Sequence, residues 1–193
     1  MTVSLDHIGV YATDRRWDDI QQALDEADYS CISQSDISII LMELAFYGAT
    51  ELVEQLIAKG PDLNFRYDAP SKYAYHVKAY PGATALTQTI CGSEDRHPTF
   101  ETMALLLRKG ADPNLIGYSS QTPLQLAIMY DRPEHAVLLL LYGANPYLPS
   151  IDINDPDAFD YASDHPWAKK MLERLKPEFG EKKGLKFCNF TKQ

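Results

Sequence analysis

Apolar residues recur along this chain in pairs of short segments with helical spacing, and glycine or other turn residues separate the segments. The clearest pair starts at Thr122 and Pro123, continues to Ala127, and ends with four leucines, 138–141, before Gly143. Threonine can cap a helix, and proline at the first helical position lacks an N–H group that would have no partner there. Glycine after the second segment accepts the left-handed backbone of a helix C-cap. This stretch therefore predicts two short helices joined by a turn.

The helical pair repeats with a period of 33 residues, which is the separation between Gly110 and Gly143. A single pair cannot bury its apolar face alone, so neighbouring pairs must stack to form a core. The pattern predicts five repeats, which begin near these residues: Asp6, Ile39, Thr84, Thr122 and Asp157. The first repeat has the weakest pattern, but its apolar positions keep the period relative to the second repeat.

Two stretches interrupt this period. The interval from Ile39 to Thr84 contains twelve extra residues, which we place within residues 65–81. The interval from Thr84 to Thr122 contains five extra residues, within residues 91–99 between two helices. Glycine, proline and charged residues in the second insertion predict a loop. In the first insertion, six of the seventeen residues are aromatic or histidine, which is unusual for a short polar turn.

The start Thr122-Pro123-Leu124 with Ala127, and the end Gly143-Ala144, resemble the signature of the ankyrin repeat. The resemblance covers residues 5–175 and implies an all-α ankyrin-repeat solenoid of about five helix-turn-helix units, with an enlarged finger loop and a C-terminal tail. The implied array spans residues 1–175, with units near 5–36, 37–81, 82–119, 120–154 and 155–175, and a basic tail follows at 176–193. Ala85 in place of proline departs from the signature without changing the period.

In the family resembled, the repeats are non-enzymatic scaffolds that recognise proteins through finger loops and the surface of each first helix. Transferred to this sequence, these positions are the candidates for binding a partner: Phe65, Arg66, Tyr67, Tyr73, Tyr75, His76, Tyr80, Glu43, Gln88 and Gln125. Tyrosine and arginine suit this role because they combine a large contact area with a polar group. The alternative is that the tyrosines of residues 65–81 fold back and cover the flank of the second and third repeats. Both roles can coexist.

The charge distribution narrows the class of partner. The formal net charge is −9, and residues 1–60 hold eleven acidic against three basic residues. Nucleic acids and anionic membranes need a cationic surface on the protein that binds them, so the acidic charge argues against both. We expect the partner to be a protein with a basic surface, and we expect the chain alone to be a monomer. The longest uncharged apolar run, residues 136–142, is too short to span a bilayer, and no secretory signal is visible. Three widely spaced cysteines favour a reducing, cytoplasmic location.

Candidate chemical sites are weak in this sequence. Residues 152–157 are similar to the start of a calcium-binding loop, but Asp157 stands where that loop needs glycine. The histidines lack metal-ligand spacing, and His135 falls at an apolar helix position where we expect it to be half-buried. Cys91 and His97 share one loop and could form a nucleophile and base, but no third catalytic residue or oxyanion element accompanies them. We therefore expect no catalytic residue, no metal and no cofactor.

Together these patterns predict a cytoplasmic, non-enzymatic binding module. A sharper hypothesis is an inhibitor or immunity protein that binds a toxin or an enzyme. A second hypothesis is a host-directed effector that acts by mimicry, and a remote third is an enzyme that uses the Cys91–His97 loop. We expect the basic tail from Lys176 to cap the last repeat, because its apolar residues, Phe187 and Phe190 among them, need cover. The alternatives are a disordered, solvated end and a basic targeting tail.

Overall fold

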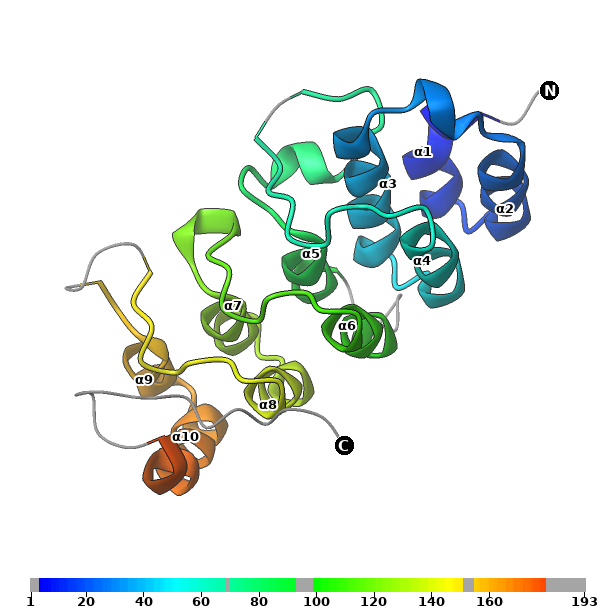
Figure 1. The fold of residues 1–193 in the computed structure, drawn as a ribbon. Coiled ribbons are helices and arrows are strands. Elements are labelled where there is room, and N and C mark those ends of the chain that lie inside the picture. The colour runs from blue at the N-terminus through cyan, green and yellow to red at the C-terminus, as the bar shows by residue number, and fades with distance from the viewer. Residues whose placement is uncertain (1–3, 69, 93–98, 151–154, 180–193) are drawn as a thin grey trace. The chain divides into compact units, whose positions relative to one another are not determined.

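The computed structural model describes residues 4–68, 70–92, 99–150 and 155–179 of the 193-residue chain. Helices make up its regular structure, and no strand occurs among these residues (Figure 1). The chain forms two compact parts. The N-terminal part comprises residues 1–112 with 117–119, and the C-terminal part comprises residues 113–116 with 120–193. The expected all-α fold is confirmed.

Helix pairs build the N-terminal part. They are α1 (Ile8–Thr13) with α2 (Trp17–Glu26), α3 (Gln34–Phe46) with α4 (Thr50–Ile57), and α5 (Ala85–Cys91) with α6 (Thr99–Arg108). The 3-10 helices η1 (Leu5–His7) and η2 (Tyr29–Cys31) lead into α1 and α3. The first helices pack in the order α1, α3, α5, and α4 packs against α6 in the row of second helices (Figure 1). The core between them includes the fully buried side chains of Ile40, Leu44 and Leu106.

Two further helix pairs build the C-terminal part. They are α7 (Pro123–Met129) with α8 (Pro133–Leu141), and α9 (Ala158–Tyr161) with α10 (Pro166–Phe179). The 3-10 helix η4 (Tyr118–Ser120) precedes α7, and η5 (Ala162–Asp164) joins α9 to α10. α7 packs against both α8 and α9. Leu124, Leu139 and Leu172 have no exposed area and lie in the core of this part.

Helix starts follow the predicted capping residues in three repeats. Thr84, Thr122 and Asp157 each accept a hydrogen bond from the backbone N–H three residues later, and the side chain of that residue bonds back to the N–H of the cap. This reciprocal arrangement pairs donors that a helix start otherwise leaves without partners. Gly110 and Gly143 adopt positive φ angles of 103° and 91°, as the C-cap prediction requires. The local signals of the repeat are therefore confirmed.

The first helix of the second repeat begins earlier than the period predicted. We expected this repeat to begin near Ile39, but α3 starts at Gln34 with Ser33 as its N-cap. The Ser33 hydroxyl accepts a hydrogen bond from the Asp36 backbone N–H at 3.1 Å. A serine followed three residues later by an acidic residue is itself a helix-start signal. α3 therefore gains more than one turn beyond the repeat pattern.

Both insertions occur where the period was interrupted. α5 ends at Cys91 and α6 begins at Thr99, and residues 93–98 of the intervening loop are outside the described ranges. Residues 65–81 join α4 to α5 and contain the 3-10 helix η3 (Val77–Ala79). No helix within the described ranges has the length and apolarity needed to cross a membrane.

Candidate partner-binding surface

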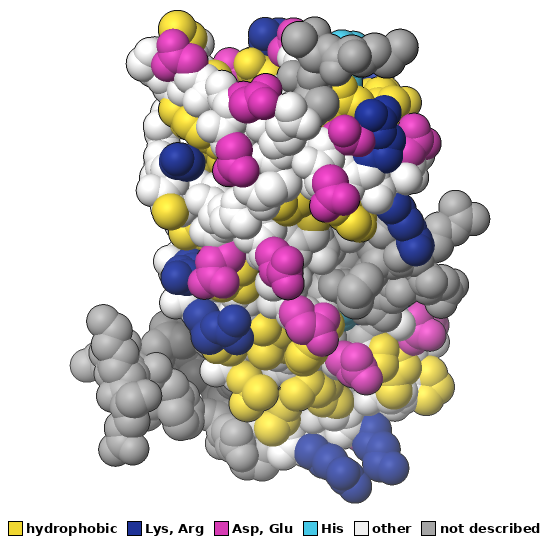
Figure 2. Space-filling view, turned by 90° about the vertical axis from the view of Figure 1, so that its right-hand side faces the viewer, with side chains coloured by type: hydrophobic (Ala, Val, Ile, Leu, Met, Phe, Trp, Pro, Cys, Tyr) yellow, Lys and Arg dark blue, Asp and Glu magenta, His cyan; other side chains and the backbone are white. Residues whose placement is uncertain are grey.

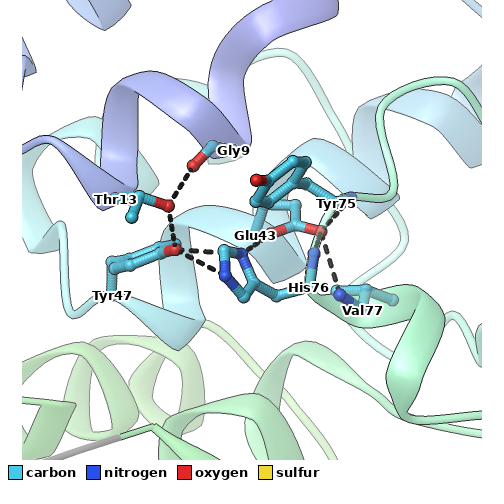
Figure 3. Close-up of polar contacts among 7 residues, drawn as sticks. All are labelled: Gly9, Thr13, Glu43, Tyr47, Tyr75, His76 and Val77. Atoms are coloured by element: carbon cyan, nitrogen blue, oxygen red, sulfur yellow. Dashed lines mark hydrogen bonds and ion pairs between the residues drawn. The ribbon is translucent and has the colours of Figure 1, made fainter.

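Residues 65–81, which we call the strap, fold onto the first helices of the first two repeats. At the base of the strap, the Gly82 N–H donates to the Tyr67 carbonyl at 2.7 Å, and the Tyr67 N–H donates to the Ala83 carbonyl at 2.8 Å. Further along, η3 packs on α3, and Tyr75 reaches Gly9 of α1 (Figure 3). The strap therefore covers helix surface that a short finger loop would leave open.

A buried carboxylate holds the strap on α3. Glu43 has no exposed area, and its Oε1 accepts hydrogen bonds from three successive backbone N–H groups (Figure 3). These donors are Tyr75 at 2.5 Å, His76 at 2.6 Å and Val77 at 2.9 Å. The three N–H groups lie at the start of η3, where a helix leaves donors without partners and favours a negative charge. The second oxygen, Oε2, is buried without a hydrogen bond and lies 3.4 Å from His76 Nδ1, which can form an ion pair with it only when the imidazole is protonated. The strap backbone therefore satisfies Oε1, and His76 is the cationic group nearest to Oε2.

A second group of contacts joins the strap to α1. The Tyr47 hydroxyl lies 2.8 Å from Thr13 Oγ1 and 2.9 Å from the His76 ring nitrogens (Figure 3). Thr13 in turn donates to the Gly9 carbonyl at 2.8 Å. Burial raises the pKa of Tyr47 to about 12, although the Thr13 hydrogen bond acts in the opposite direction. The Phe46 ring stacks on the His76 imidazole with ring centres 5.2 Å apart, so polar and aromatic contacts fix the strap together.

Close approach of the strap to α1 depends on a glycine. A Cβ atom placed on Gly9 would lie 2.2 Å from Tyr75 Cβ, which is closer than real side chains come. Gly9 therefore gives the strap room to lie directly against the helix. Nothing in the repeat pattern indicated this role, because Gly9 lies inside α1 rather than at a turn.

The outer side of the strap presents aromatic and cationic side chains. Tyr75 is 43% exposed, and the Lys78 ammonium lies 5.2 Å from its ring centre. Tyr80 is half-buried and meets Tyr118 edge to face, with ring centres 4.9 Å apart. Arg66 is exposed. The strap backbone is bonded to Glu43 of α3 and packs against Gly9 of α1, and this holds its aromatic side chains in place.

The exposed charges of the strap differ in sign from those of the preceding residues. Arg66, Lys72 and Lys78 are exposed on the strap, together with Asp68. Lys72 forms an ion pair with Asp6 at 2.9 Å. By contrast, ten of the eleven acidic residues in residues 1–60 are exposed or half-buried, and only Glu43 is buried. The strap is thus a cationic and aromatic strip on an acidic surface.

The structure corrects the expectation for five of the ten candidate residues. Their side chains are buried and have little or no area to offer a partner: Glu43, Gln88, Gln125, Tyr67 and Tyr73. Glu43 is buried because it binds the strap backbone, and Gln88 is buried on α5, which packs against α3. Tyr67 and Tyr73 are 8% and 7% exposed, which supports the packing alternative for these two.

Gln125 has a structural role in the C-terminal part. Its Oε1 accepts a hydrogen bond from the Thr122 N–H at 2.7 Å, completing the helix cap. Its Nε2 donates to the carbonyls of Leu148 and Pro156 at 3.1 and 2.9 Å. The side chain thus braces the loop that follows α8 instead of facing outward.

The remaining five candidates all lie on the strap and keep exposed area. They are Phe65, Arg66, Tyr75, His76 and Tyr80, of which Arg66 and Tyr75 are exposed and the others half-buried. Sequence reasoning missed Tyr47, Thr13 and Tyr118 as their supports. One signal was available, since Glu43 interrupts an apolar run from residue 39 to residue 45, and a charged residue there needs a buried partner.

A groove lies beside this surface in the N-terminal part. It has a volume of about 470 Å³ and lies at the turns that end α1 and α3. Its lining includes Tyr47, Trp17, Arg15, Asp18 and Glu51. Because the lining carries both basic and acidic side chains, it favours neither a purely anionic nor a purely cationic ligand.

The side chains that could bind a metal ion do not cluster in the described part of the chain. No group of three or more His, Cys, Asp or Glu side chains that could hold a metal occurs in that part. His135 has no exposed area, so it is more deeply buried than we expected. Cys91 is half-buried, whereas His97, residues 151–154 and the tail 180–193 lie outside the described ranges. Three expectations therefore stay predictions: those for the pair Cys91 and His97, for residues 152–157, and for the tail as a cap of the last repeat.

Comparison with known proteins identifies related sequences. A family model described as "Ankyrin repeats (3 copies)" matches residues 41–150. The ankyrin repeat and KH domain-containing protein mask-1 of Caenorhabditis elegans is 33% identical over 118 residues, which are 61% of this chain and 4% of that protein. A putative ankyrin repeat-containing protein of Treponema pallidum (strain Nichols) is 34% identical over 103 residues, or 52% of this chain and 28% of that protein.

A third relative is viral. The putative ankyrin repeat protein R664 of Acanthamoeba polyphaga mimivirus is 42% identical over 65 residues, which are 34% of this chain and 39% of that protein. The chain thus spans less than two fifths of the length of each of these relatives. None of the three names states an enzyme activity.

Proposed function

This chain belongs to the ankyrin-repeat family, whose repeats are protein–protein interaction modules, and from that premise we propose that it binds its partner through the outer side of the strap. The observation that carries the proposal is the fixation of the strap by Glu43 and Gly9. An aromatic surface on a fixed backbone loses little conformational entropy when it binds. Tyr75, Tyr80 and Arg66 are the anchors of this surface, with Phe65 and His76 at their sides.

The chemistry of the partner follows from the surroundings of the strap. The exposed carboxylates of Asp18 in α2 and Glu51 in α4 line the groove beside the strap and favour a partner with basic residues. The strap itself carries Arg66 and Lys78, so the basic residues of the partner would meet the acidic helices rather than the strap. We therefore propose a partner that places an apolar or aromatic surface on the tyrosines and basic residues at their flank.

The biological role proposed for this complex is inhibition of the partner, as expected of an inhibitor or immunity protein. A monomeric, acidic binding module can cover a basic site on a toxin or enzyme, and this supports the proposal. A cytoplasmic location suits the thiol of Cys31, which forms no disulfide among the described residues. The competing role is that of a host-directed effector, which a translocation assay would identify. The remote enzymatic alternative would fail if Cys91→Ala and His97→Ala leave every phenotype unchanged.

A capture experiment with matched variants tests the proposed surface. The tagged chain is used to retain proteins from the native cell lysate at physiological salt. A strap variant carries Arg66→Glu, Tyr75→Ala and Tyr80→Ala, whereas a control variant carries Arg108→Glu and Tyr130→Ala. Tyr130 is 40% exposed, which matches the exposure of Tyr75. Circular dichroism and melting curves establish that both variants are folded.

The strap variant is expected to lose the partner that the wild-type chain and the control variant retain. Raising the salt concentration should weaken retention, because part of the attraction comes from exposed charges. Equal retention by the strap variant and the wild-type chain would refute the proposed surface. Failure of the wild-type chain to retain any protein would count against the binding function itself.

A further inference from the structure

The second helix of the fourth repeat carries an exposed apolar surface. Leu141 is 71% exposed, Val137 is 45% exposed and Tyr142 is 39% exposed, and we call these three residues the α8 patch. Val137 and Leu141 lie one helical turn apart and therefore face the same side. Figure 2 shows hydrophobic side chains gathered at the height that α8 and α10 occupy in Figure 1.

The α8 patch is unusual among the second helices. Among the described residues of α2, α4, α6 and α10, no large hydrophobic side chain is exposed. These helices bury their apolar residues and place charged residues outward, as expected for a helix with one face in solvent. A leucine with 71% of its area in water gains little hydrophobic free energy from folding. Neighbouring exposed apolar residues are typical of a surface that another chain segment covers.

The sequence supplies a segment with matching chemistry. α10 ends at Phe179 in the same compact part as α8, and residues 180–193, outside the described ranges, follow it directly. They include the apolar residues Leu185, Phe187 and Phe190, and four lysines against one glutamate. Leu185 and Phe187 are two positions apart, so an extended chain would point both to one side.

The length of residues 180–193 and the place where they leave α10 also favour this segment as the occupant of the α8 patch. At roughly 3.3 Å per residue, fourteen extended residues span on the order of 45 Å, whereas the nine residues of α8 measure only about 14 Å. The start of α10 is joined to the turn before α8, because Trp167 Nε1 donates to Asp131 Oδ1. The segment therefore begins on a helix that is bonded to the neighbourhood of the patch.

We propose that residues 180–193 dock on the α8 patch, with Leu185 and Phe187 covering Val137 and Leu141. The positive charge of the segment complements the acidic remainder of the chain and adds a weak attraction. This inference does not rest on the strap, and it can hold whether or not the strap binds a partner. A second copy of the chain and an unrelated protein are the competing occupants of the patch.

Disulfide trapping with the native Cys188 tests this proposal in the full-length chain. Cys31→Ser and Cys91→Ser remove the other thiols, and a second cysteine is introduced by Leu141→Cys or Val137→Cys. Ser163→Cys serves as the control, because Ser163 is exposed in the same compact part but lies on η5. Oxidised glutathione is the oxidant, and mass spectrometry follows the rate of intramolecular bond formation.

Docking predicts bond formation about tenfold faster from the two patch positions than from Ser163→Cys, because docking raises the effective concentration of Cys188. Adding Leu185→Ser and Phe187→Ser should remove this difference and leave the control rate unchanged. Equal rates at all three positions would overturn the proposal. Sedimentation analysis of the full-length chain covers the competing occupant, since a dimer that Leu141→Lys dissociates would also overturn it.

Discussion

Replacement of Glu43 by alanine tests whether one buried carboxylate fixes the strap. The substitution removes the acceptor of three backbone N–H groups and leaves these donors at the start of η3 without their partner. A buried charged pair that loses one partner typically costs about 3–5 kcal/mol, and each hydrogen bond to a charged group contributes roughly 1.5–3 kcal/mol. Water can reach the Tyr75 N–H after the change, so the three bonds do not add fully. We expect a loss of about 3–5 kcal/mol in the free energy of unfolding.

The assay is urea unfolding followed by circular dichroism, together with hydrogen exchange of the strap amides. Glu43→Gln should cause an intermediate loss, because the amide oxygen can still accept the three bonds but carries no charge. Glu54→Ala is the matched control. Glu54 is 62% exposed and lies 3.7 Å from Lys109, and an exposed ion pair of this kind contributes less than about 1 kcal/mol.

The outcome separates two accounts of the strap. If Glu43 fixes it, the amides of Tyr75, His76 and Val77 lose protection in Glu43→Ala but keep it in Glu54→Ala. If both variants unfold at the same urea concentration and exchange alike, the reasoning is wrong. The strap would then owe its position to Val77 and the surrounding aromatic rings alone.

Three further predictions follow from the same contacts. Gly9→Ala should destabilise the chain by about 1–3 kcal/mol in urea, because the new methyl group overlaps Tyr75. Burial raises the pKa of Tyr47 to about 12 in the folded chain, above its ordinary value near 10. The contribution of the neutral hydroxyl to the free energy of unfolding is therefore fully present below pH 10 and is lost as the pH rises through 12. The urea midpoint should fall more steeply between pH 10 and 12 in the wild-type chain than in Tyr47→Phe. Leu139→Ala should cost about 2–5 kcal/mol in urea, since this fully buried side chain would leave a cavity.

The regular features of the fold could be predicted because their signals are local. A helix cap such as Thr122 with Gln125, or a C-cap such as Gly143, is encoded within four residues and recurs with the period. The early start of α3 also had a local signal in Ser33 and Asp36. It was missed because the period placed the start near Ile39, and the capping signal outweighs the period there.

The site could be predicted only in outline. The aromatic insertion was identified from its length and composition, but its placement depends on contacts with Glu43, which lies 32 to 34 residues earlier in the chain. No local pattern indicates such a pairing. Gln88 and Gln125 were expected on the surface because the resemblance assigns those helix positions outward. In this chain, packing on α3 and bonds to a loop bury them.

The proposal that the strap is the partner-binding surface is tested most directly by hydrogen exchange of the complex with the captured partner. The amide exchange of the free chain is compared with that of the complex, peptide by peptide. The account predicts slower exchange in peptides that cover residues 65–81 and 117–119, where Tyr75, Tyr80 and Tyr118 lie. Slower exchange confined to other elements, with the strap unchanged by the partner, would contradict the claim that the strap is the binding surface.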